Sequence, residues 1–291
     1  MHRTNSKLIR VGHSPDADDA FMFYALAEGK IPALGFQIEH VVEDIESLNQ
    51  RALRAELEVT AVSCHAYSYM ADQYFILRSG ASVGDRYGPI LVAPQDGMYA
   101  KTKKISPSNI RGKRIAIPGK LTTAYLLLRL FEENFEAVFV PFDQILEAVK
   151  SGDMDFGLVI HEGQITYQEE GLAKVLDLGQ WWFDQTELPL PLGIDVIRKD
   201  LGKGAIQEFA MLFKESIKYA LQNREEALQY ALQFGRGIQP EQGDRFVAMY
   251  VNEYTLDIGK RGEAALQRLF DEGYEKKILP KRITVSPLLL L

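Results

Sequence analysis

Cysteine is almost absent from this sequence of 291 residues, because Cys64 is its only cysteine and no disulfide can form within the chain. This excludes a small secreted domain held together by disulfides. Long hydrophobic runs are absent as well: none approaches the roughly 20 apolar residues that cross a bilayer, and residues 287–291 are too short to anchor anything. Residues 1–7 lead directly into a short strand without the apolar stretch of a signal peptide. We therefore expect a cytoplasmic protein with no membrane partner.

An excess of positive charge is also missing, since 33 lysines and arginines stand against 40 aspartates and glutamates, and the formal net charge is -7. A basic face for nucleic acid is not indicated, and we expect no nucleic-acid partner. An anionic small molecule is not excluded, because backbone amides and helix N-termini bind anions without net positive charge.

Sequence motifs for metals and nucleotides are lacking too. Paired cysteines do not occur, and Ile165 stands where a zinc motif beginning at His161 would need its second histidine. The turn at Gly119 is not a phosphate-binding loop, because Arg114 stands where the leading glycine would be. No Gly-x-Gly-x-x-Gly segment follows a strand. We therefore expect neither a metal nor a cofactor.

The pattern that is present is an alternation of short strands and helices. The first unit has expected strands at 8–12, 36–42 and 59–62 and expected helices at 20–28 and 44–57. This order is typical of a parallel sheet. A second unit of the same kind begins after a polar segment at 94–109, and the chain returns through the proline-rich residues 188–193.

These two crossings predict an α/β fold of two lobes with a cleft between them. Lobe 1 would comprise residues 1–93 and 194–291, with several helices at its end, and lobe 2 would comprise residues 94–193. This is the layout of a type 2 periplasmic binding protein, whose lobes close on a ligand by a hinge motion.

His161 is the leading candidate for a catalytic residue. Residues 156–160 form a short apolar run that predicts a buried strand, and His161 and Glu162 follow it directly. Ligands of open α/β sheets lie at the carboxyl ends of the strands, and the ordinary pKa of histidine suits proton transfer near neutral pH. A histidine that only satisfies a buried carbonyl would follow the same pattern. The rest of the chain favours the catalytic role.

Hydroxyl groups stand at two similar positions. Thr122 and Thr123 open an expected helix directly after a strand, where hydroxyls, free amides and the helix dipole make an anion site. An ordinary helix cap is the alternative. Ser63 ends its strand in the same way and either faces the cleft or bonds to local backbone. His65 either shares that site or is exposed.

The loop at residues 13–19 joins the first strand to the first helix. Ser14 and Asp18 are both good residues for capping that helix. The functional alternative is that they offer a polar edge to the cleft. Aspartates there would need a hydroxyl-bearing or cationic group on the ligand, because carboxylates repel an anion.

Several segments together resemble the 1,4-dihydroxy-6-naphthoate synthase family of the futalosine route to menaquinone. The segments lie at 14–26, 119–125, 157–162, 188–193, 250–252 and 256–259. The resemblance implies a lyase that converts cyclic de-hypoxanthine futalosine to 1,4-dihydroxy-6-naphthoate without a metal or redox cofactor. It also implies that His161 is the base and that the hydroxyls of Ser63, Thr122 and Thr123 contact a small aromatic carboxylate.

One segment departs from the family pattern. The family usually reads Ser-Pro-Cys-Pro-Asn-Asp where this chain has Ser14-Pro15-Asp16-Ala17-Asp18-Asp19. If this loop touches the substrate, the negative charge added at Asp18 could change what is bound. The chain would then be a divergent branch with an altered substrate.

Two other functions remain as alternatives. The first is a non-catalytic solute-binding or sensor protein for a small aromatic carboxylate, because the fold is used mostly for binding. The second is chorismate dehydratase, which shares the fold but whose motifs the Thr-Thr turn and the Ile160-His161-Glu162 segment resemble less. The sequence leaves a homodimer open.

Overall fold

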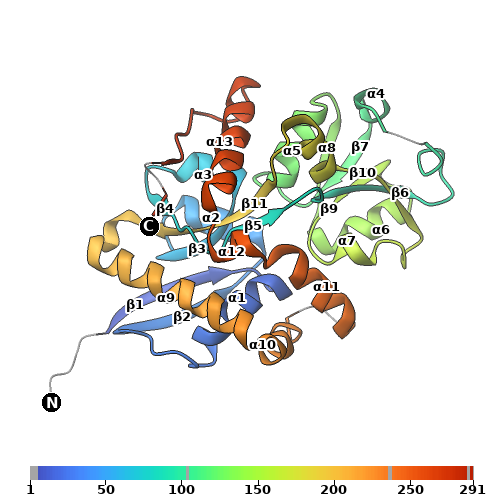
Figure 1. Cartoon of the computed structure of the whole chain (residues 1–291). Helices are drawn as coiled ribbons and strands as arrows, with labels where there is room; N and C mark the ends of the chain where they lie inside the picture. The colour runs from blue at the N-terminus through green and yellow to red at the C-terminus, as the bar shows by residue number, and fades with distance from the viewer. Residues whose placement is uncertain (1–5, 103–104, 235–237, 287–288, 291) are drawn as a thin grey trace, which may run out of the picture.

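Two β-sheets, each covered by helices, form the framework of the protein (Figure 1). The computed structural model describes residues 6–102, 105–234, 238–286 and 289–290. The two-lobe α/β fold predicted from the sequence is confirmed. Within the described residues, no helix is both long and apolar enough to cross a membrane.

The first sheet has the strand order β2-β1-β3-β11-β4, and β5 also pairs with β11. Its strands are β1 (Lys7–His13), β2 (Phe36–Val42), β3 (Val59–Ser63), β4 (Tyr74–Ile76), β5 (Ser82–Gly84) and β11 (Leu190–Arg198). β1 runs parallel to β2 and β3, whereas β11 runs antiparallel to its three neighbours. The parallel β1 and β3 therefore bring their carboxyl ends, near Ser14 and Ser63, to one edge of the sheet.

The second sheet has the order β10-β6-β9-β7-β8. Its strands are β6 (Ile90–Pro94), β7 (Arg114–Ile117), β8 (Glu136–Phe139), β9 (Phe156–Val159) and β10 (Leu172–Asp177). β7 is parallel to β8 and β9, so the carboxyl ends of β7 and β9 also meet at one edge. The turn at Thr122 and the residue His161 follow these two ends.

Helices cover both sheets. Those of the first lobe are α1 (Ala17–Ala27), α2 (Ile45–Leu53), α3 (Cys64–Met70), α9 (Lys203–Gln222), α10 (Arg224–Ala231), α11 (Pro240–Tyr250), α12 (Glu253–Leu256) and α13 (Gly259–Glu275). Those of the second are α4 (Pro107–Ile110), α5 (Thr123–Phe131), α6 (Ile145–Lys150), α7 (Gly163–Thr166) and α8 (Leu178–Thr186), and two short 3-10 helices occur at Phe142–Gln144 and Lys199–Leu201. α1 packs against α9, α10 and α11, which explains why nearly all of its residues are buried.

The strand pairing places the division between the sheets differently from the sequence analysis. β6 pairs with β9 and β10 in the second sheet, although residues 1–93 were expected to form part of lobe 1. β11 begins at Leu190 in the first sheet, before the expected return at residue 194. We therefore propose that the chain crosses at residues 85–89 and again at 187–189.

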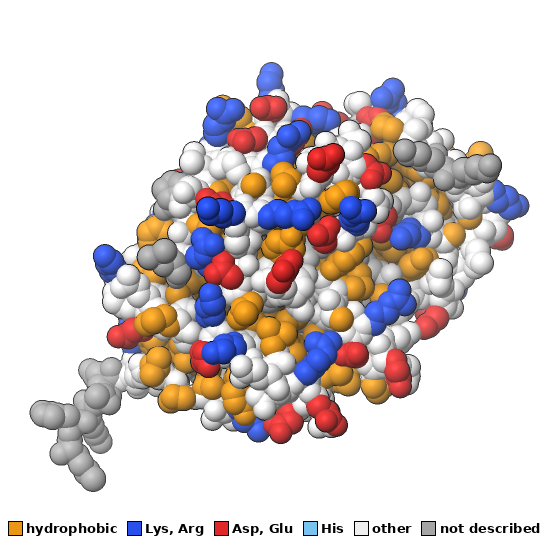
Figure 2. Space-filling view, in the orientation of Figure 1, with side chains coloured by type: hydrophobic (Ala, Val, Ile, Leu, Met, Phe, Trp, Pro, Cys, Tyr) orange, Lys and Arg blue, Asp and Glu red, His pale blue; other side chains and the backbone are white. Residues whose placement is uncertain are grey.

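The aromatic residues near position 182 lie on α8, a helix that the sequence analysis did not anticipate. Asp177 begins it by accepting hydrogen bonds from the amides of Gly179 and Gln180. Trp182 is buried and its indole N–H donates to the carbonyl of Pro189 at 3.1 Å, beside the return crossing. These contacts give Trp182 a packing role. On the face drawn in Figure 2, positive and negative side chains are interspersed.

Candidate active site

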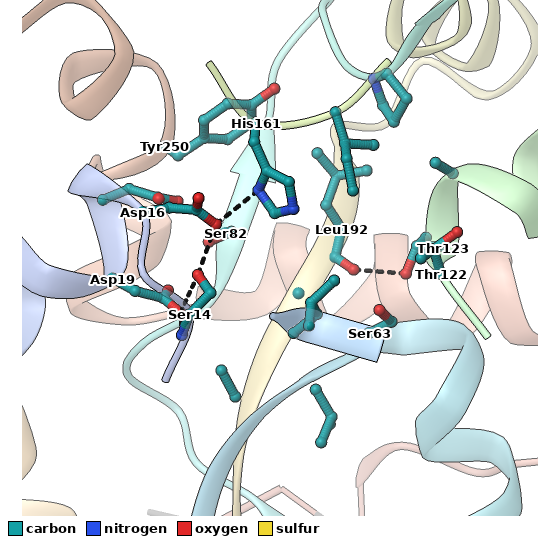
Figure 3. A pocket seen from close by; sticks show the side chains of 18 of the residues that line it. Ser14, Asp16, Asp19, Ser63, Ser82, Thr122, Thr123, His161, Leu192 and Tyr250 are labelled. Carbon is teal, nitrogen blue, oxygen red and sulfur yellow. Dashed lines mark hydrogen bonds and ion pairs between the residues drawn. The ribbon is translucent and has the colours of Figure 1, made fainter. Parts of the chain in front are cut away.

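A pocket between the two lobes contains all six residues that the sequence analysis selected. Its walls include Ser14, Asp18, Ser63, Thr122, Thr123 and His161. The empty space amounts to about 700 Å³ including the open mouth, which is within the range of small-molecule sites. Figure 3 shows Ser14, Asp16 and Asp19 on one side of this space and Ser63, Thr122 and Thr123 on the other. The structure thus brings the imidazole and the hydroxyls together in one pocket.

His161 enters the pocket from a strained turn at the end of β9. Its backbone has φ 57°, in the left-handed region, which costs a residue other than glycine on the order of 1–3 kcal/mol. β9 ends two residues earlier at Val159, and α7 begins two residues later at Gly163. The side chain of His161 is 16% exposed, and the ring of Phe142 stands edge-on to it at 5.3 Å. The local backbone therefore directs the imidazole into the cleft.

Asp16 from the other lobe binds this imidazole. Nδ1 of His161 lies 2.7 Å from Oδ2 of Asp16, and the Ser14 hydroxyl also donates to Oδ2 at 2.7 Å. Burial lowers the pKa of His161, but the charge of Asp16 and the hydrogen bond to it raise it, and the balance puts the pKa at about 9. An imidazolium facing a carboxylate is therefore the favoured state of the pair at neutral pH.

Burial opposes the negative charge that Asp18 would add to the pocket. Burial, followed by the charges of Asp19 and Asp16, raises the pKa of Asp18 well above its ordinary value. Burial likewise raises the pKa of Asp19 to about 6, although hydrogen bonds from Ser14 oppose the shift. A protonated Asp18 is neutral and can donate a hydrogen bond to an anionic ligand.

The two threonines on the opposite side have structural partners as well. The Thr122 hydroxyl accepts from the amide of Tyr125 at 3.2 Å and donates to the carbonyl of Gly119 at 2.9 Å, so it caps α5. The Thr123 hydroxyl donates to the carbonyl of Leu192. The capping alternative is thus correct for Thr122, and what both threonines still offer a ligand is the amino end of α5.

Ser63 is held more loosely. Its hydroxyl accepts from Nδ2 of Asn49 at 3.1 Å, and its amide donates to Oδ1 of the same residue at 2.9 Å. Among the described residues, no protein acceptor takes the hydroxyl hydrogen of Ser63, which leaves it available to a ligand. Asn49 lies on α2, and its two hydrogen bonds position Ser63.

His65 lies behind the pocket wall. It is buried, and its Nδ1 lies 3.2 Å from the carbonyl of Thr122. Burial lowers the pKa of His65 to about 4, so the ring stays neutral. Of the two alternatives in the sequence analysis, exposure is wrong, and His65 supports the turn before α5 from the other lobe.

Comparison with known proteins shows the family to which the chain belongs. The sequence pattern of a family described as menaquinone biosynthesis matches residues 9–275. The chain belongs to this menaquinone biosynthesis family. A curated relative from Thermus thermophilus, named 1,4-dihydroxy-6-naphtoate synthase, is 41% identical over 91% of this chain and 93% of its own length.

Solved structures extend the family likeness to the fold. A crystal structure of an Archaeoglobus fulgidus protein is 49% identical and superposes with a TM-score of 0.86 over 96% of this chain and 100% of the other. The periplasmic aliphatic sulphonate binding protein of Escherichia coli is only 11% identical but has a TM-score of 0.67 over 98% of this chain and 92% of its own. The second likeness shows the periplasmic-binding-protein fold alone.

As a member of the menaquinone biosynthesis family, the protein is a lyase-type enzyme that acts on a small molecule. Within the described part of the chain, no group of three or more His, Cys, Asp or Glu side chains is arranged to hold a metal ion.

Several residues of the pocket were missed from the sequence. They include Asp16, Asp19, Ser82, Gln164 and Tyr250. The Tyr250 hydroxyl donates to Oε1 of Gln164 at 2.8 Å and joins α11 to α7 across the cleft. Asp16 belongs to the segment at residues 14–19 that departs from the family pattern, but its position before a helix is typical of a turn residue. Nothing local in the sequence links Gln164 to Tyr250.

Proposed function

We propose that the protein converts cyclic de-hypoxanthine futalosine to 1,4-dihydroxy-6-naphthoate, with His161 as the general base. The observation that carries this proposal is that His161 and the amino end of α5 face the same pocket from different strand ends. The sequence similarity to the Thermus thermophilus enzyme supports the choice of reaction.

The two sides of the pocket have complementary tasks in this proposal. The amides at the start of α5 and the Ser63 hydroxyl bind the carboxylate of the aromatic ring, because the helix dipole favours an anion there. Nε2 of His161 removes a proton as the ring aromatises. Protonated Asp18 donates a hydrogen bond to a ligand oxygen, so the acidic loop does not repel the anion. The contacts between the lobes exclude water during the reaction.

Base catalysis requires the neutral imidazole. Because the pKa of His161 is about 9, the neutral form becomes more abundant as pH rises toward 9. We therefore expect kcat/KM for naphthoate formation to increase between pH 7 and 9 and then level off. A rate that falls over this range would contradict the assignment of His161 as base and would indicate an acid instead.

A substitution tests the role of His161. Asparagine tolerates positive φ, so His161→Asn should preserve the turn while removing the base. We expect the rate of naphthoate formation from the purified substrate to drop by about 10²–10⁴-fold. His40→Asn, the same change outside the pocket, is the matched control and should keep its activity. A His161→Asn variant with the full rate would exclude this role.

The same experiment separates the enzyme from a binding protein. A protein that binds the naphthoate reversibly but never forms it from the cyclic substrate would be the solute-binding or sensor protein. Conversion of chorismate instead would identify a chorismate dehydratase.

A further inference from the structure

We propose that Asp16 is a positioning residue for His161, which accepts the Nδ1–H of the imidazole across the cleft and leaves Nε2 facing the ligand. The proposal rests on the proposed function, because it assigns to Asp16 the task of orienting the base of that reaction.

The conformation of Asp16 shows that helix capping does not explain its presence. It occupies the residue before α1 with an extended backbone, φ -110° and ψ 154°, where an aspartate usually accepts from helix amides. Here its side chain makes no such bond to α1. Its Oδ2 lies instead 2.7 Å from Nδ1 of His161, which is 145 residues away in the chain and in the other lobe.

The carboxylate is itself held in place. The side chain of Asp16 is 1% exposed, and Oδ2 accepts from the Ser14 hydroxyl at 2.7 Å. Ser14 is in turn fixed by Asp19, which accepts from the backbone amide of Ser14 at 2.7 Å. This chain of contacts gives Asp16 one position, as an orienting group requires.

The imidazole is confined from the other directions as well. The ring of Phe142 stands edge-on to it, and the left-handed backbone at His161 fixes the start of the side chain. Nδ1 of His161 is bound to Asp16. Figure 3 shows the other ring nitrogen turned away from Asp16 and into the pocket. A hydrogen bond at Nδ1 therefore determines which nitrogen can take the substrate proton.

Asp16 is also the strongest charge acting on the ring. The other acidic groups that act on His161 are Asp18 and Asp19 at the start of α1 and the neighbouring Glu162. Asp16 adds to its charge a direct hydrogen bond to the imidazole. Burial alone would lower the pKa of His161, so Asp16 is the main reason that the ring accepts a proton readily.

The direct test is an NMR titration of the histidine side chains in the ligand-free protein, with His161 assigned through His161→Asn. The wild-type protein should show His161 titrating near pH 9 with the proton on Nδ1 in its neutral form. In Asp16→Asn, which preserves shape but removes the charge, the midpoint should fall by about one pH unit or more. A wild-type midpoint at or below the ordinary value of about 6.5 would overturn the proposal, whether or not the variant folds.

The matched control is Asp195→Asn. Asp195 is buried near Asp18 and Asp19, but it makes no hydrogen bond to His161. Its substitution should leave the His161 midpoint unchanged. An equal fall in both variants would contradict a specific role for Asp16.

Turnover then separates this proposal from the proposed function. In Asp16→Asn, the rising limb of the kcat/KM profile should move to lower pH with the midpoint, and the plateau of kcat should fall by about 10-fold or more with a smaller change in KM. A wild-type enzyme that is active, with a variant whose profile and midpoint are both unchanged, would reject the role of Asp16 alone. A wild-type protein whose His161 midpoint is raised but that forms no naphthoate would reject the proposed function. The positioning of His161 by Asp16 would then still stand.

Discussion

At the scale of single residues, Asp195 shows how burial determines protonation. Both of its carboxyl oxygens are buried, and neither has a hydrogen-bond partner within the described residues. Burial raises the pKa of Asp195 well above its ordinary value, because an unpaired charge is very unfavourable in such a place. Gly80 explains the close fit, since a Cβ there would lie 2.2 Å from Oδ2 of Asp195.

Asp195→Asn should therefore stabilise the protein in a pH-dependent way. The unfolded chain loses the Asp195 proton near pH 4, whereas the folded chain retains it, so this group lowers stability as pH rises above about 4. We expect the melting temperature of Asp195→Asn relative to wild type to be higher at pH 8 than at pH 4. Thermal unfolding followed by circular dichroism at the two pH values measures this. If the melting temperatures of the variant and wild type differed by the same amount at pH 4 and pH 8, the assigned protonation state of Asp195 would be contradicted.

His65 has the opposite linkage. Its folded pKa of about 4 is below the unfolded value of about 6.5, so the unfolded chain gains a proton first and stability falls as pH drops between these values. His65→Asn can still donate to the carbonyl of Thr122 but does not titrate. The stability of wild type relative to this variant, from denaturant unfolding, should decrease from pH 7 to pH 4.5. No change would mean that His65 is not a neutral donor in the fold.

At the scale of elements, the sequence predicts where polar groups stand better than which groups meet. Parallel strands place their carboxyl ends at one edge, so His161, Ser63 and Thr122 could be selected from position alone. The direct partner of His161 could not be selected in this way, because Asp16 lies on another element and resembles a helix cap.

The pairing of the strands could not be predicted from the sequence either. An apolar run in the sequence indicates that a strand is buried, but it does not show which strand lies beside it. β6 pairs with segments more than 60 residues away, in the second sheet. α8 was missed because its aromatic residues gave no clear helical stripe, and its start depends on the cap at Asp177.

At the scale of the whole molecule, hydrogen bonds join the two lobes around the pocket. They include Asp16 to His161, the amide of Leu121 to Glu46 at 3.0 Å, and Tyr250 to Gln164. The described conformation is therefore a closed one, in which both lobes contribute to the same site.

Tyr250→Phe should weaken this closure without removing a catalytic group. The lost hydrogen bond is worth about 0.5–1.5 kcal/mol, which corresponds to about 2–10-fold. We expect KM to rise by that factor with a smaller change in kcat, measured by steady-state kinetics of naphthoate formation. Tyr254→Phe on the nearby α12, outside the pocket, is the matched control. A fall in kcat alone would show that Tyr250 acts in the chemical step and not in closure.

Light scattering of the purified protein would decide between a monomer and a homodimer, which the sequence left open. Cell fractionation would test the predicted cytoplasmic location.

The central claim is that His161 and the amino end of α5 bind the same ligand. A crystal structure of the protein with 1,4-dihydroxy-6-naphthoate tests it most directly. We expect the carboxylate to lie about 3 Å from the amides of Thr123 and Ala124, with the ring within reach of Nε2 of His161. A naphthoate bound in the neighbouring crevice lined by Tyr87 and Arg245, or one that does not touch His161, would contradict the account.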